Sequence, residues 1–143
     1  MKETPQQYIQ RMLSHTEGQQ PLKVQAATAK KIERLLKGVP AAKLRKRPAP
    51  DKWSVAEILA HIADTEIVGA WRMRLILGAP GSPVHAFDQD AWVTALHYGK
   101  RDARKALEQF RVLRETNLAL LEITHARTVE TFRHARRARR GIH

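Results

Sequence analysis

The chain has 143 residues, no cysteine and a formal net charge of +12 at pH 7. This length fits one domain with a buried core, and the lack of cysteine excludes disulfides, thiolate catalysis and cysteine-ligated zinc. No apolar run is long enough to cross a bilayer and the N-terminus lacks the apolar core of a signal peptide, so we expect a cytoplasmic protein. The charge is uneven: residues 124–143 hold six arginines and one acid, whereas the preceding 123 residues carry 20 basic and 13 acidic groups.

Residues 4–15 and 21–38 predict the first two helices. Pro21 suits a first helical turn, and Gly38 suits the left-handed residue that often follows a helix. The next segment, residues 39–53, contains three prolines and cannot be helical throughout.

The clearest element begins at Ser54, which forms a predicted capping box with Glu57. Apolar residues then recur at helical spacing for about 24 residues, and we expect them to be buried. They are Val55, Ile58, Leu59, Ile62, Ile67, Trp71 and Leu75. Asp88 or Asp90 would cap a short helix within residues 87–99. Asp102 would cap a long helix whose predicted buried residues are Ala106, Leu107, Phe110, Leu113, Leu118 and Leu121.

Amphipathic helices without convincing strand patterns predict an all-α fold, specifically an antiparallel four-helix bundle. The C-terminal segment is a poor fourth helix, because Val129 and Phe132 are its only large apolar residues before Ile142. We therefore expect a helical bundle over residues 1–123, with its last helix missing or aberrant, and a basic, aberrant tail over residues 124–143.

His61 lies on or beside the expected buried face of the helix that begins at Ser54. One interpretation is a half-buried histidine hydrogen-bonded to a neighbour. The other is a metal ligand, because histidines facing inward from several helices form three-ligand sites with open positions. Asp64, one turn on, would then orient His61 or supply an oxygen ligand. One histidine does not make a site, so the residues alone leave both interpretations open.

The segment RPAPDKWSVAEILAHIADTEIVGAWRMRLILG, residues 47–78, resembles the second-helix signature of the DinB-like (DinB/YfiT) family. Residues 21–38 and 87–121 support the resemblance, which covers residues 5–122. It implies a four-helix bundle, often dimeric, that holds a divalent metal such as zinc or nickel through three histidines. It also implies metal-dependent hydrolysis or transfer reactions of small thiols. The W-S-x-x-E-x-x-x-H pattern places the first ligand at His61, with the other two expected as H-x-x-x-H on the last helix.

The C-terminal histidines do not form that pattern. His125, His134 and His143 are spaced by nine residues, which sets neighbouring members on opposite faces of a helix. The family would lead us to expect a segment such as TPEQWKHFGMHAERG here. Codons can be chosen that encode this expected segment in one reading frame. Read one base out of frame, the same codons encode HARTVETFRHARRAR, the sequence of residues 125–139. We therefore hypothesise that this segment is an out-of-frame reading, which would leave His61 without its two partners.

These patterns favour a protein descended from a metal-dependent hydrolase or thiol-linked transferase, with an incomplete metal site. A non-catalytic bundle that acts through self-association or partner binding is the alternative. Unpaired apolar faces predict a homodimer or other self-association, with Trp53, Trp71 and Trp92 as core or dimer anchors. A basic nucleic-acid binder is a third alternative, suggested by charge clusters such as KLRKR (43–47), although charge without a shaped surface indicates no specific binding.

Overall fold

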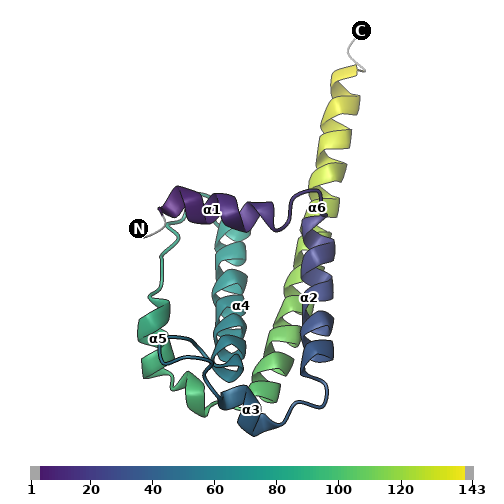
Figure 1. The fold of residues 1–143 in the computed structure, drawn as a ribbon. Coiled ribbons are helices and arrows are strands. Elements are labelled where there is room, and N and C mark those ends of the chain that lie inside the picture. Colours follow the sequence, from purple (N-terminus) through teal and green to yellow (C-terminus); the bar gives the residue numbers. More distant parts are fainter. Residues whose placement is uncertain (1–3, 141–143) are drawn as a thin grey trace. The chain divides into compact units, whose positions relative to one another are not determined.

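The computed structural model describes residues 4–140, including the side chains of residue 4 and residues 6–125. Seven helices follow one another: α1 (Pro5–Ser14), α2 (Pro21–Leu36), α3 (Ala41–Arg45), α4 (Val55–Gly78), α5 (Gln89–Ala95), the 3-10 helix η1 (Tyr98–Lys100) and α6 (Ala103–Arg140) (Figure 1). The described residues contain no strand, which confirms the predicted all-α class. The chain divides into two units, Met1–Lys37 and Gly38–His143, and each is described by itself.

The first unit contains α1 and α2, close to the predicted helices. Thr4 caps α1: its hydroxyl accepts a hydrogen bond from the Gln7 backbone N–H at 3.2 Å, and the Gln7 side chain accepts one from the Thr4 N–H at 2.9 Å. Pro21 opens α2, as expected. Just after this helix, Gly38 adopts a φ of +74°, a left-handed conformation that costs glycine little.

In the second unit, the capping box at the start of α4 is confirmed. The Ser54 hydroxyl accepts a hydrogen bond from the Glu57 N–H at 3.2 Å, and Glu57 Oε2 accepts one from the Ser54 N–H at 2.7 Å. The Glu57 carboxylate also forms an ion pair with Arg47. Glu57 therefore ties the proline-rich loop to the first turn of α4.

The contact between α4 and α6 is the most extensive between any two elements. The buried apolar residues of α4 are mostly small: Ala56, Leu59, Ala60 and Ala63. On α6, Ala106, Leu107, Phe110 and Leu118 are buried as predicted. The predicted face of α4 was wrong for its larger residues, since Ile58, Ile67 and Trp71 are 45%, 46% and 62% exposed. The apolar side chains of α4 are spread around the helix and its buried residues include Glu57 and Asp64, so the periodicity does not choose a face. The predicted homodimer, which would cover such residues, stays a prediction.

Helices α4 and α6 run in the same direction (Figure 1). Gly99, just before α6, lies against Glu57 in the first turn of α4, and further along Arg114 pairs with Glu66. The connection, residues 79–102, carries α5 and η1 back to the end at which α4 begins. The predicted antiparallel arrangement therefore does not apply to this pair, although the helical-bundle class holds.

Aspartates cap the two helices that follow α4. Asp88 Oδ1 accepts hydrogen bonds from the N–H groups of Asp90 and Ala91 at 2.9 and 3.0 Å, so Asp88 is the cap of α5. Asp102 Oδ1 accepts two bonds of 2.9 Å from N–H groups in the first turn of α6, as predicted. Both caps satisfy backbone donors that a helix leaves unpaired at its start.

The backbone of α6 is helical as far as Arg140, so it continues unbroken into the segment that we predicted to be a separate tail. The side chains of residues 126–140 lie outside the described part, and the boundary at residue 124 stays a prediction. Over the described residues, no helix is both long and apolar enough to cross a membrane.

The interaction of Glu57 with Arg47 predicts a loss of stability in acid. Hydrogen bonds from Arg47 hold the pKa of Glu57 at about 2, against an ordinary value of 4.5. Because the folded-state pKa is the lower one, the stabilisation is present above pH 4.5 and is lost as the pH falls towards 2. We expect it to be on the order of 2 kcal/mol, allowing for screening of the half-exposed Arg47.

Urea unfolding at several pH values in this window measures the effect. Glu57→Gln should remove most of the pH dependence, whereas Glu122→Gln, at an exposed position on α6, should leave it intact. Equal slopes in the wild type and the Glu57 variant would contradict the assignment.

Candidate functional site

His61 lies in the second turn of α4, partly exposed at the surface of the helix. Its ring packs edge-on against the Trp53 ring, with centroids 5.1 Å apart and planes at 68°. Nε2 lies 3.4 Å from the Thr65 hydroxyl oxygen. Nδ1 is buried and has no hydrogen-bond partner among the described residues. A buried ring nitrogen without a partner is uncommon in proteins.

The surroundings of His61 favour the neutral imidazole. Burial lowers its pKa below the ordinary value of 6.5, and the charges of Asp64 and Asp90 act in the opposite direction. Because burial is the largest cause, His61 is neutral at pH 7. This is the form in which an imidazole nitrogen carries a lone pair for a metal ion.

Asp64 is buried, and its nearest charged partner is an arginine rather than His61. Arg101 Nη1 donates to Asp64 Oδ2 at 2.7 Å, and Arg101 Nη2 donates to Gln109 Oε1 at 3.0 Å. The Tyr98 hydroxyl is fully buried without a hydrogen-bond partner among the described residues. Burial, together with the Asp64 charge, raises the pKa of Tyr98. The predicted role of Asp64 in orienting His61 stays a prediction, since no hydrogen bond joins the two.

A second polar network lies two residues further along α4. Arg114 Nη2 lies 2.7 Å from Glu66 Oε2, and the Asn117 side-chain amide donates to Glu66 Oε1 at 3.0 Å. Arg74 in turn donates to the Asn117 side-chain oxygen at 3.3 Å. These contacts join α4 to α6 beyond Asp64 along α4, further from His61. Sequence reasoning missed Arg101, Arg114 and Asn117, because each lies 37 or more residues from its partner.

The described residues do not fit a three-ligand metal centre. No group of three histidine, cysteine or acidic side chains comes together in this part of the chain. His125 belongs to the wrong end of α6: Asn117 already lies beside Glu66, five residues along α4 from His61, and His125 lies eight residues or about 12 Å further along α6. His134 and His143 lie outside the described side chains. Among the side chains that the structure describes, one expected ligand, His61, is present and no second imidazole joins it in a group of three ligands.

A family model described as the DinB superfamily matches residues 26–142. The chain belongs to the DinB superfamily. The resemblance seen in residues 47–78 is therefore confirmed, and the match also extends into the segment 124–143. No curated protein matches this DinB-superfamily chain.

One solved structure similar to this DinB-superfamily chain is YfiT from Bacillus subtilis, described as a probable metal-dependent hydrolase with an unusual four-helix bundle topology. The TM-score is 0.65 at 20% sequence identity, and the match covers 71% of this chain. The chain spans 58% of the length of the YfiT chain that it matches. At this identity the likeness concerns the fold, and it confirms the DinB-like four-helix bundle.

The Asp64–Arg101 pair predicts an asymmetric response to mutation. Arg101→Gln leaves a carboxylate that is only 9% exposed without its cation, which we expect to cost about 2–4 kcal/mol of unfolding free energy. Adding Asp64→Asn should recover part of this loss, because the buried charge disappears. Lys52→Gln, which breaks the exposed pair with Asp51, should cost under about 0.5 kcal/mol. Denaturant titrations of the four proteins measure these values, and a double variant less stable than Arg101→Gln would contradict the interpretation.

Proposed function

We propose that this chain descends from a divalent-metal-dependent hydrolase or thiol-linked transferase and holds an incomplete metal site, so that it does not catalyse by itself. The observation that carries the proposal is the state of His61. Its ring is neutral and held by Trp53, and its Nδ1 is buried without a partner, yet the described residues provide no group of three ligands. Membership of the DinB superfamily and the description of YfiT support the metal-dependent ancestry.

A single imidazole supplies too little affinity to retain a catalytic metal. Catalytic zinc sites use three protein ligands and keep a further position for water or substrate. Asp64 is an unsuitable second ligand, because its carboxylate already accepts a charge-assisted hydrogen bond from Arg101. We therefore derive no reaction step at His61.

Metal binding tests the proposal directly. The purified chain, loaded with excess zinc or nickel and dialysed against a weak chelator, should retain well under one equivalent by elemental analysis. His61→Ala and His125→Ala should leave that low value unchanged. Retention of one equivalent that is lost in His61→Ala would overturn the incomplete-site proposal and support an active metalloenzyme.

We also propose that residues 125–139 are an out-of-frame reading, which accounts for the missing partners of His61. This segment carries five of the six C-terminal arginines and offers Val129 and Phe132 as its only large apolar residues. Such a composition cannot bury a face against a bundle. The sequence of the encoding DNA tests the idea. Removing one base near codon 125 should open a frame that encodes an amphipathic helix with H-x-x-x-H, and a frame without that motif would contradict it.

A further inference from the structure

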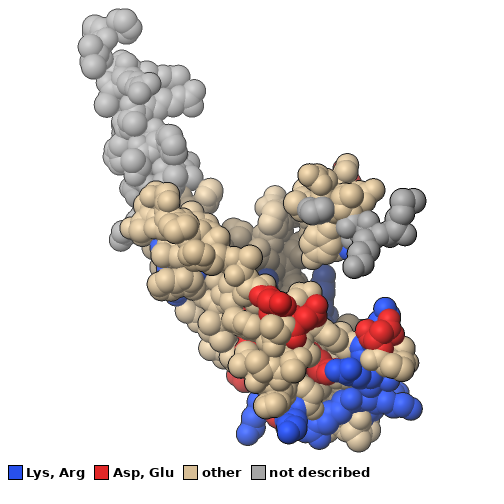
Figure 2. Space-filling view, turned by 90° about the vertical axis from the view of Figure 1, so that its left-hand side faces the viewer, with Lys and Arg blue, Asp and Glu red and all other residues tan. Residues whose placement is uncertain are grey.

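A cluster of cations forms where α3 and the first turn of α6 meet. Its members come from two segments far apart in the sequence, and we call them the α3–α6 basic patch: Lys43, Arg45, Lys46, Lys100, Arg104 and Lys105. All six are exposed. Arg45 and Arg104 line one small cavity together with Asp102, and Arg104 Nη2 donates to the Val39 carbonyl oxygen at 3.0 Å. On the face drawn in Figure 2, Lys and Arg side chains gather in one region.

The acids around the patch are already engaged. Glu57 pairs with Arg47, Asp64 with Arg101 and Asp51 with Lys52. The Asp102 carboxylate accepts hydrogen bonds from two backbone N–H groups of α6. None of the six patch cations has a salt bridge among the described residues. The Asp102 charge acts on Lys105 and Arg45, but one carboxylate against six cations leaves a net positive field that favours an external anion.

The form of the patch favours an extended polyanion. The cavity between Arg45 and Arg104 has a volume of about 30 Å³, too small for an organic anion. The cations are instead spread over an exposed surface. Residues 40–52 and 97–108 expose no large apolar side chain, since Leu44, Tyr98 and Leu107 are buried. The patch thus lacks the apolar wedge with which proteins enter a membrane interface, and also exposed aromatic side chains that would stack on bases.

We propose that the α3–α6 basic patch binds the phosphate backbone of nucleic acid without sequence preference. Lysine and arginine side chains provide this kind of binding through phosphate contacts and the release of counterions. The proposal is independent of the metal site, because His61 is not among the cations of the patch.

The test measures binding of the full chain to fluorescent DNA duplexes of two unrelated sequences, between about 50 and 200 mM salt. A patch variant carries Lys43→Gln, Arg45→Gln, Lys46→Gln and Lys105→Gln. We expect equal affinities for the two sequences. In the patch variant, the slope of log affinity against log salt should become shallower by about four, close to one unit for each cation removed.

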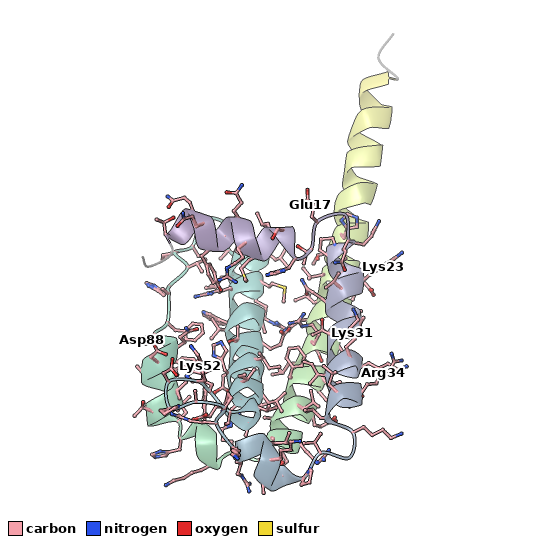
Figure 3. All side chains as sticks on the ribbon, in the orientation of Figure 1. Glu17, Lys23, Lys31, Arg34, Lys52 and Asp88 are labelled. Atoms are coloured by element: carbon pink, nitrogen blue, oxygen red, sulfur yellow. The ribbon has the colours of Figure 1, made fainter. Side chains whose placement is uncertain are left out.

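A matched control removes the same charge from α2, through Lys23→Gln, Lys30→Gln, Lys31→Gln and Arg34→Gln. These residues are exposed, and Figure 3 labels three of them along α2. The control should keep the wild-type salt slope. An equal loss in both variants would mean that net charge alone drives binding, and would overturn the proposal. Circular dichroism confirms that each variant is folded.

A third variant separates the patch from the arginine-rich segment, through Arg133→Gln, Arg136→Gln, Arg137→Gln and Arg140→Gln. The patch contribution should persist in this background, so that adding the patch substitutions weakens binding further. If the third variant alone abolishes DNA binding, the proposal is wrong. It is equally wrong if the patch substitutions remove binding to phosphatidylserine vesicles and leave DNA binding unchanged, which would identify an anionic membrane surface as the ligand.

Discussion

The second unit is organised around one buried carboxylate, that of Glu57. It accepts hydrogen bonds from the Ser54 N–H and from Arg47, and Gly99 lies against it. One side chain therefore fixes where α4 begins, holds the proline-rich loop, and sits where η1 leads into α6. A Cβ at position 99 would lie 3.5 Å from Glu57 Oε1, an ordinary van der Waals contact, so the approach itself does not require a glycine. The second turn of α4, with His61 and Asp64, takes its position from this anchored start.

Polar contacts then set how α4 and α6 pair. The α4 side of the contact is formed mainly by alanines, which allow the helices to approach closely but bury little apolar area. Smooth faces of this kind allow several registers. Two ion pairs from neighbouring carboxylates of α4, Asp64 with Arg101 just before α6 and Glu66 with Arg114 within α6, favour one register of the two helices. These buried ion pairs would then contribute to the choice of one helix arrangement more than to the net free energy of unfolding.

Local signals allowed much of the fold to be predicted, and the misses follow from long-range contacts. The capping box at Ser54 and the cap at Asp102 depend on residues within one turn, so these two helix starts could be predicted. The face of α4 could not, because its apolar residues are spread around the helix and its buried residues include Glu57 and Asp64. The parallel pairing of α4 with α6 and the partner of Asp64 depend on where residues 79–102 lead the chain. The α3–α6 basic patch joins segments more than 50 residues apart, of which the sequence revealed only KLRKR.

The parallel pairing also constrains how the site at His61 could ever be completed. His61 lies near the end at which both helices begin, since Asp64 contacts Arg101 just before α6. Each later residue of α6 lies about 1.5 Å further along the axis and away from His61. At Asn117, α6 already lies beside Glu66, and the helix continues without a break to Arg140. A longer α6 therefore cannot bring a second imidazole to the first. The missing ligands can come only from a chain that turns back towards η1 or from a second molecule. A metal site at His61 therefore requires a segment that runs in another direction from the one that follows Asn117 in this chain.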